Sequence, residues 1–170
     1  MVKLFLKKRV EKLLKGFERK KTFRKYEDIK RIVLLFEIED FEKVVDFVDK
    51  LKADGKEVSA YSFDQKKRIF PVVPDYFHIW NNSKMTVLGF PDSADLKLFK
   101  ENGHDTLIDL TNHSIPLYNF LFLNSDADFR VGCDNKNSTL YDLLIERKPE
   151  QDFSFFAEQL LFYMKSLRSK

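Results

Sequence analysis

The sequence predicts an α/β fold: a Rossmann-like, mostly parallel sheet of about five strands with helices on both faces, preceded by a basic amphipathic N-terminal helix. Strand-like and helix-like hydrophobic patterns alternate along most of the chain, as in a parallel sheet with crossover helices. The run IVLLF at residues 32–36 is continuously apolar, which is typical of a strand buried on both faces. With 170 residues, of which 44% are hydrophobic, the chain is long enough for one domain with a sizeable core.

The first half of the body predicts a βαβ unit. The strand at residues 32–36 is followed by a helical pattern, which Asp40 is placed to cap and Gly55 to end. A second strand at residues 57–63 completes the unit, whose crossover is normally right-handed. The expected core side of the helix carries Phe41, Val44, Val45, Val48 and Leu51.

The second half predicts further alternation. Residues 66–80 contain Pro71 and Pro74 and are expected to be irregular. A helix at residues 93–101 is expected to be capped by Ser93. The remaining elements are expected as strands at residues 85–90, 105–110 and 128–133, helices at residues 114–123 and 153–167, and either a last strand or a helix start at residues 141–145.

Charge divides the chain into a basic segment and an acidic body. Residues 1–31 hold 13 Lys and Arg against 4 Asp and Glu, a net charge of +9, whereas the remaining residues have a net charge of −6. We therefore expect residues 1–28 to form a basic helical arm and residues 29–170 a single α/β domain. Helical spacing predicts one apolar stripe on the arm, made of Leu6, Val10, Leu13, Leu14 and Phe17.

Three interpretations of the arm remain open. Its stripe could pack on the body, on a second copy in a homo-oligomer, or on a protein partner. The Lys and Arg side chains of residues 1–31 could instead bind nucleic-acid phosphates. They could also bind an anionic membrane surface, with Leu4, Phe5 and Phe17 inserting beside them.

A cytoplasmic location is expected. Cys133 is the only cysteine, so that an intrachain disulfide is excluded and a reducing compartment fits best. The apolar stretch at residues 4–6 is interrupted at once by three cations, unlike a signal peptide. We expect no transmembrane segment, because no apolar run approaches the roughly 20 residues that a span requires.

Polar side chains at the expected strand ends are the candidate site. Ligands of open parallel sheets bind outside the carboxyl ends of the strands. Asp109 and His113 are the catalytic candidates, because a carboxylate can orient a histidine that acts as acid or base. The structural alternative is a histidine that caps the next helix or lies in solvent. The candidates for ligand binding are Glu37, Asp64, Thr111 and Asn112.

No metal site or cofactor is predicted. The acidic residues Glu37, Glu39 and Asp40 could hold Mg²⁺, but acidic side chains also commonly occupy the first turn of a helix. The glycine-rich GxGxxG and GxxxxGK[ST] phosphate loops are absent from the sequence, as are HExxH and GxSxG. A nucleotide cradle of the usual kind is therefore not expected.

One stretch carries a resemblance. DTLIDLTNHSIPLYNFLFLNSDADFRVGC at residues 105–133, followed by YDLLI at residues 141–145, resembles an uncharacterised family of short bacterial α/β proteins, a domain of unknown function. This resemblance implies the fold and no activity. The segment is more distantly similar to the N-terminal half of heptosyltransferase-type glycosyltransferases, through IDL at residues 108–110 and RVG at residues 130–132. That similarity implies a sugar-nucleotide ligand.

These observations leave the function unknown and favour one hypothesis over another. The first is a non-enzymatic cytoplasmic binding or scaffold domain whose basic arm contacts a partner. The alternative is a small enzyme, or a sugar-phosphate or nucleotide binder, that uses the strand-end side chains. An enzyme needs several such groups aimed at one point, whereas a binding domain does not.

Overall fold

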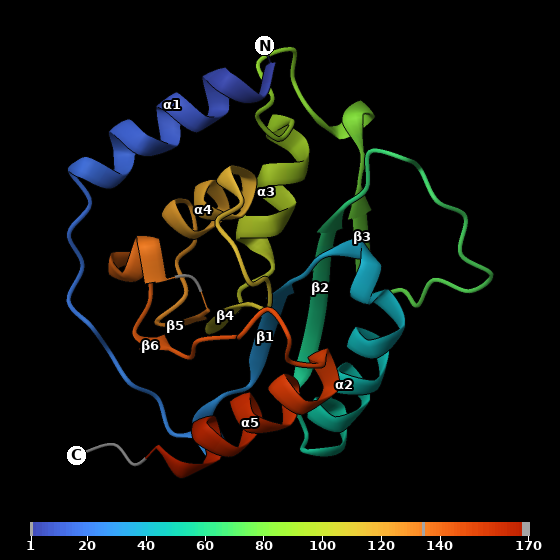
Figure 1. Cartoon of the computed structure of the whole chain (residues 1–170), viewed down its shortest axis with the longest axis vertical. Helices are drawn as coiled ribbons and strands as arrows, with labels where there is room; N and C mark the ends of the chain where they lie inside the picture. Colours follow the sequence, from blue (N-terminus) through green and yellow to red (C-terminus); the bar gives the residue numbers. More distant parts are fainter. Residues whose placement is uncertain (1, 134, 168–170) are drawn as a thin grey trace.

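The sheet confirms the predicted fold class, with six parallel strands rather than about five (Figure 1). This computed structural model describes residues 2–133 and 135–167. The strand order is β3-β2-β1-β4-β5-β6, which is the strand order of dinucleotide-binding Rossmann sheets. The strands are β1 Arg31–Leu35, β2 Glu57–Phe63, β3 Phe77–Trp80, β4 Thr106–Asp109, β5 Phe129–Gly132 and β6 Leu143–Leu144.

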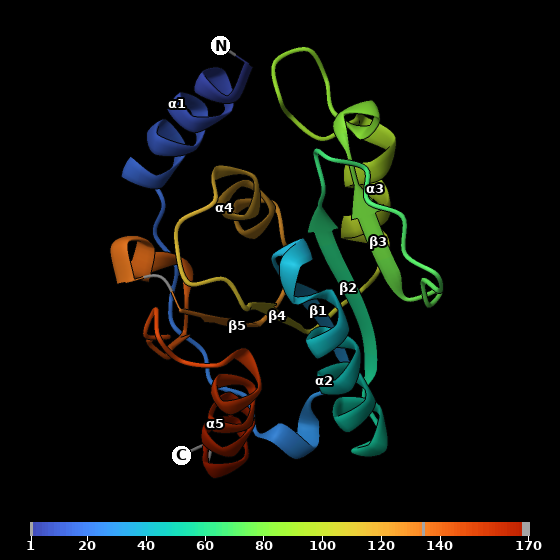
Figure 2. The same cartoon turned by 45° about the vertical axis from the view of Figure 1, so that its right-hand side comes forward.

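Helices cover both faces of this sheet. Figure 2 shows α2 and α5 on one side, with α1 and α4 on the other. The face of α2 and α5 forms one apolar cluster, and the buried side chains of α1, α3 and α4 belong to a second. The bounds are α1 Val2–Lys15, α2 Phe41–Ala53, α3 Ser93–Glu101, α4 Pro116–Leu123 and α5 Phe153–Ser166.

The buried strand β1 explains the continuous apolar run. Ile32 and Leu34 belong to the cluster under α2 and α5, whereas Val33 and Leu35 belong to the opposite cluster. Successive side chains of a strand point to opposite faces. Because helices cover both faces of this central strand, its last four positions are all buried and apolar, and only Arg31 at its start is exposed.

Two local predictions are wrong. Residues 85–90 form a turn rather than a strand: the Gly89 amide donates to the Thr86 carbonyl, and Gly89 has a φ of 83°. The segment predicted to be irregular ends in strand β3, which lies at the edge of the sheet. An edge strand of four residues with two half-buried positions carries a weak pattern.

The helix starts also differ in detail from those expected. Asp92, and not Ser93, occupies the position that precedes α3, and Ser93 is the first helical residue. Asp40 does precede α2, but its side chain makes no capping hydrogen bond. Residues 143–144 adopt the strand alternative.

The N-terminal segment lies against the body along its length. Leu6 and Val10 of α1 are buried in the cluster that contains α4. After α1, the chain passes the β5 and β6 end of the sheet, where the Arg19 guanidinium pairs with the buried Asp142 carboxylate. The Thr22 amide donates to the same carboxylate at 2.9 Å. The division of the chain at residue 28 stays a prediction, and the apolar stripe of α1 serves the fold.

Shortening a side chain on this stripe tests the packing of α1. We expect Val10→Ala to lower the free energy of unfolding by about 1 to 2 kcal/mol, because Val10 is buried and a buried cavity results. The matched change Leu4→Ala, on the exposed side of α1, should cost less than about 0.5 kcal/mol. Urea unfolding curves of both variants measure the difference. Equal effects would contradict this packing.

Candidate functional site

The crevice at the carboxyl ends of β1 and β4 is the natural ligand site of this topology. The two strands are neighbours, and Leu35 of β1 pairs with Asp109 of β4. From β1 the chain proceeds to β2 on one side, whereas β4 leads to β5 on the other. Ligands of doubly wound sheets bind where the strand order reverses in this way.

Three of the six candidate residues meet at this crevice. The His113 Nδ1 atom lies 3.2 Å from Glu37 Oε1 and 2.9 Å from Asn112 Oδ1. Glu37 follows β1, whereas Asn112 and His113 follow β4. We expected His113 to act with Asp109 at the end of its own strand. In the structure, the carboxylate beside His113 is that of Glu37, at the end of β1.

The other three candidates shape the backbone of their own loops. The Asp109 carboxylate is buried and accepts hydrogen bonds from the amide and hydroxyl of Thr111. The Asp64 carboxylate is also buried and accepts from the amides of Lys66 and Arg68. Such turns formed by an aspartate side chain fix a loop after a strand. Asp64 thus defines the start of the long connection from β2 to β3.

The Glu37 carboxyl has an unusual environment. Burial raises its pKa above the usual value, and the neighbouring charges of Asp40 and Glu39 act in the same direction. The opposing influences are His113 and Arg147, which favour the ionised carboxylate. Glu37 is thus a half-buried acid whose ionised form is stabilised by a positively charged neighbour.

The turn between β1 and α2 is acidic and lacks glycine. Dinucleotide-binding sheets place a glycine-rich turn and a phosphate group here, against the start of the helix. This chain has Glu37, Glu39 and Asp40 in that turn. The preceding carbonyl, of Phe36, accepts hydrogen bonds from the hydroxyls of Ser62 and Tyr118. Three carboxylates would repel a phosphate group at this position.

Next to this crevice lies an apolar cavity of about 710 Å³. Its walls come from α1, the turn after β1, the end of β2, the turn at residues 85–90 and the start of α4. Of the six candidate residues, Glu37 is the one that lines it. The lining residues are Leu6, Glu37, Ile38, Glu39, Phe63, Gln65, Asn82, Met85, Thr86, Val87, Gly89, Ile115, Pro116, Leu117 and Tyr118.

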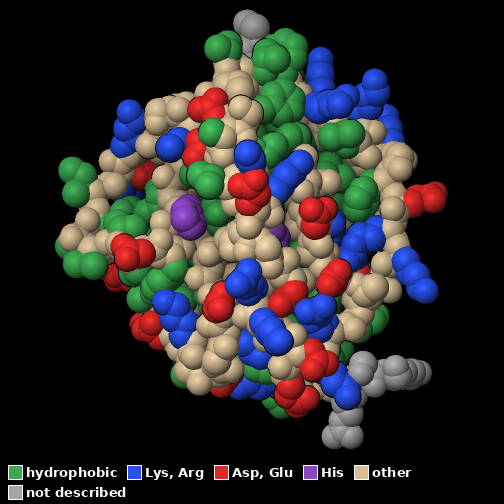
Figure 3. All heavy atoms as spheres, turned by 180° about the vertical axis from the view of Figure 1, so that it is seen from behind, with side chains coloured by type: hydrophobic (Ala, Val, Ile, Leu, Met, Phe, Trp, Pro, Cys, Tyr) green, Lys and Arg blue, Asp and Glu red, His purple; other side chains and the backbone are tan. Residues whose placement is uncertain are grey.

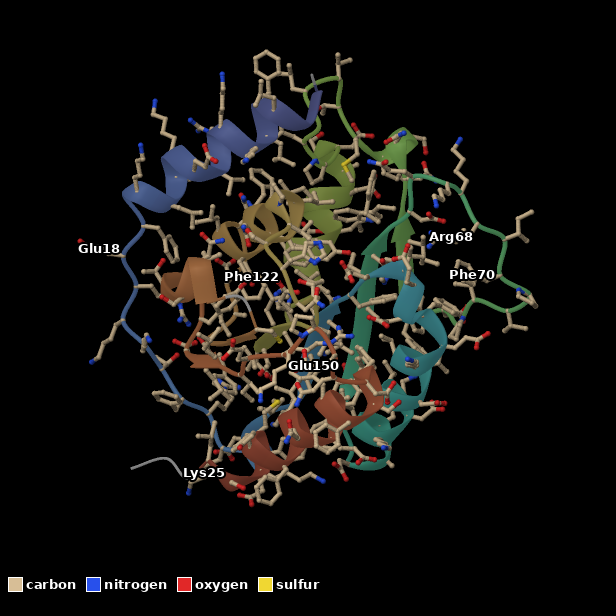
Figure 4. All side chains as sticks on the ribbon, viewed as in Figure 1. Glu18, Lys25, Arg68, Phe70, Phe122 and Glu150 are labelled. Atoms are coloured by element: carbon tan, nitrogen blue, oxygen red, sulfur yellow. The ribbon has the colours of Figure 1, made fainter. Side chains whose placement is uncertain are left out.

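The long connection from β2 to β3 packs against the acidic turn and the start of α2. Its Arg68 guanidinium pairs with Glu39 at 2.8 Å, and its Phe70 ring stacks on Phe41 at a centroid distance of 4.2 Å. Figure 4 shows both labelled side chains pointing from the connection toward α2. The cation nearest to Glu39 is therefore already paired.

The sequence pattern did not indicate this cavity. Its apolar walls belong to five separate segments, and Met85 and Val87 fell in the run that reads as a strand. Phe63 at the end of β2 lines this cavity together with the acidic turn, but the two segments are far apart in the sequence. Among the residues described, no group of three or more His, Cys, Asp and Glu side chains is arranged to hold a metal ion.

Strand order and crevice together define a Rossmann-like α/β domain whose first turn is acidic instead of glycine-rich. The chain belongs to a family of unknown function (DUF6913), whose model matches residues 3–167. No curated protein and no solved structure matches the sequence. In the described part of the chain, none of the helices has the length and apolar character needed to cross a membrane.

Proposed function

We propose that this protein is a non-enzymatic binding domain whose cavity holds a small amphipathic molecule with an apolar body and a cationic amine. The observation that carries the proposal is the apolar cavity with Glu37 in its wall. Its volume of about 710 Å³ is in the range of small-molecule sites. Mostly apolar walls with a few polar groups are typical of such sites.

The charge of the wall supports an amine. Glu37 and Glu39 are the charged members of the described lining, and Arg68 already pairs with Glu39. A cation beside Glu37 would favour the ionised carboxylate, which burial otherwise disfavours. An anionic ligand would meet two carboxylates, so that fatty acids and sugar phosphates fit the cavity less well.

The alternative function is acid or base catalysis by Glu37 and His113. The 3.2 Å contact between them at the reversal of strand order supports it. The distant similarity to heptosyltransferase-type enzymes at residues 105–145 stays a prediction. Asp109 and Thr111 are engaged with each other, which leaves fewer free groups for chemistry. A cytoplasmic location and the bacterial origin of the family stay predictions.

Three compounds of equal chain length test the proposal: octylamine, octanol and octanoate. Isothermal titration calorimetry at neutral pH should give the order octylamine, then octanol, then octanoate in affinity. Glu37→Gln should bring octylamine close to octanol, because the carboxylate that pairs with the amine is gone. Octylamine affinity should also fall as the pH is lowered through the raised pKa of Glu37, because protonation removes the negative charge.

A blocking variant makes the assignment to this cavity specific. Met85→Trp, in the wall of the cavity, should weaken octylamine binding by at least about tenfold, whereas Val72→Trp, on the exposed connection, should have no effect. Equal binding to both variants would place the ligand elsewhere. Failure of all three compounds to bind would refute the proposal. An enzymatic turnover that the wild-type protein shows and His113→Ala lacks would support catalysis instead.

A further inference from the structure

We propose that the outer face of α1, together with the turn at residues 85–90, docks on an anionic lipid bilayer. This inference goes beyond the proposed function. The turn at residues 85–90 borders both the cavity and this surface, but Phe5, Leu88, Lys8 and Lys12, which test the inference, do not line the cavity.

The cations of the N-terminal segment fall into two sets in the structure. After α1, the arginines Arg19, Arg24 and Arg31 pair with carboxylates of the body. These three arginines serve the fold.

The cations on α1 form the second set. The described cationic side chains of α1 are Lys7, Lys8, Arg9, Lys12 and Lys15, and all five are exposed. Among the residues described, no carboxylate forms an ion pair with any of them. Glu11 is the one acidic residue of α1. The described part of α1 therefore carries an excess of exposed, unpaired positive charge, which produces a positive potential over this face.

Helical spacing places lysines and exposed apolar side chains together. Leu4, Lys8, Lys12 and Lys15 follow the i, i+4, i+8 and i+11 positions of α1, so they share the side opposite the buried Val10. Leu4 and the neighbouring Phe5 are 49% and 51% exposed at the first turn of the helix. The outer face therefore has an apolar end and a basic remainder.

The turn at residues 85–90 extends the apolar end. Val87 is 86% exposed and Leu88 is 47% exposed. The turn lies beside α1, because Leu6 and Val87 line one cavity, and Arg9 and Phe90 line a second hollow. Figure 3 shows hydrophobic side chains gathered at the top of the molecule, with Lys and Arg side chains beside them at the upper right.

Charge complementarity identifies the partner as a bilayer with anionic headgroups. Exposed aliphatic and aromatic side chains flanked by lysines insert at the headgroup level, where the lysines contact lipid phosphates. A surface of this composition gains from both interactions at once. An RNA would use the lysines and the Phe5 ring. It would leave the exposed side chains of Leu4, Val87 and Leu88 without a role, because aliphatic side chains offer no stacking surface for bases.

Co-sedimentation of the full chain with vesicles tests this inference. We expect binding to phosphatidylcholine vesicles that contain about 30% phosphatidylglycerol, and none to pure phosphatidylcholine. Lys8→Glu/Lys12→Glu should weaken binding by at least about tenfold. The control Lys20→Glu/Lys21→Glu changes the net charge equally at exposed positions off the helix and should weaken binding by less than about threefold.

An apolar pair separates insertion from simple charge attraction. Phe5→Ser/Leu88→Ser should weaken vesicle binding by about fivefold or more at salt near 0.15 M. The control Phe162→Ser/Leu98→Ser removes one phenyl and one leucyl side chain of similar exposure from α5 and α3, and should leave binding within about twofold. Circular dichroism checks that each variant folds.

Three results would overturn the inference. The first is absence of wild-type binding to the anionic vesicles, and the second is equal losses in the charge pair and its control. The third is tighter binding to single-stranded RNA than to vesicles, with no effect of Phe5→Ser/Leu88→Ser. Because Phe5 and Leu88 do not line the cavity, failure here leaves the octylamine result intact, and the converse also holds.

Discussion

Gly132→Ala should destabilise the protein by about 3 kcal/mol or more, because a β-carbon at this position would overlap a buried ring. The ideal Cβ position lies 2.2 Å from Tyr141 Cε1 and 2.5 Å from two further atoms of that ring. Tyr141 is fully buried and packs edge-on against Phe122. The ring therefore has little room to retreat. Urea unfolding of the variant measures the loss.

Gly16→Ala is the matched control for this prediction. Nothing lies within 4 Å of a β-carbon at Gly16, so this substitution should leave stability unchanged or slightly increased. In the Gly132→Ala background, a second change, Tyr141→Ala, should cost less than it does in the wild-type protein, because it also relieves the overlap that the new β-carbon creates. Additive losses in this double-mutant cycle would show that another contact is responsible.

Acid should destabilise the protein through His104. Burial lowers the pKa of His104 from 6.5 to about 4, and its Nε2 atom lies 2.8 Å from the Ser125 hydroxyl. The unfolded chain binds a proton below pH 6.5, whereas the folded protein resists it down to about pH 4. The contribution to stability is therefore complete above pH 6.5 and is lost as the pH falls toward 4. The loss amounts to about 3 kcal/mol.

Comparison with His104→Gln isolates this contribution from other acid titrations. The glutamine can still hydrogen-bond to Ser125 but does not titrate. Between pH 7 and pH 4.5, the wild-type protein should lose about 2 to 3 kcal/mol more than the variant, measured by urea unfolding at each pH. Parallel losses in both proteins would assign the acid sensitivity to carboxylates instead.

The parts of the fold that could be predicted are those with a strong local pattern. The run at β1 and the amphipathic pattern of α2 each admit one structure, and both elements form as expected. Within α2, Phe47 is buried although it was not expected on the core side, and Val45 is only partly buried. The turn at residues 85–90 was misread because Val87 and Leu88 are apolar but exposed. The apolar side chains of this turn lie at the surface, but along the sequence they give the same hydrophobic pattern as a buried strand.

The candidate site was predictable to the level of strand ends. The acidic turn and His113 follow from sequence, but their pairing needs the strand order, which places β1 next to β4. Asp109 and Asp64 do lie at strand ends, as predicted. Their carboxylates accept hydrogen bonds from nearby backbone amides, so that their role is structural. The cavity could not be predicted, because it forms where α1 packs near α4, and these helices lie far apart in the sequence.

The central claim is that the cavity beside Glu37 binds an amphipathic amine. A crystal structure of the protein soaked with octylamine tests it most directly. We expect the alkyl chain among Ile38, Met85 and Leu117, with the nitrogen within hydrogen-bond distance of the Glu37 carboxylate. An empty cavity, or an alkyl chain bound with its nitrogen turned away from Glu37 into solvent, would contradict the account.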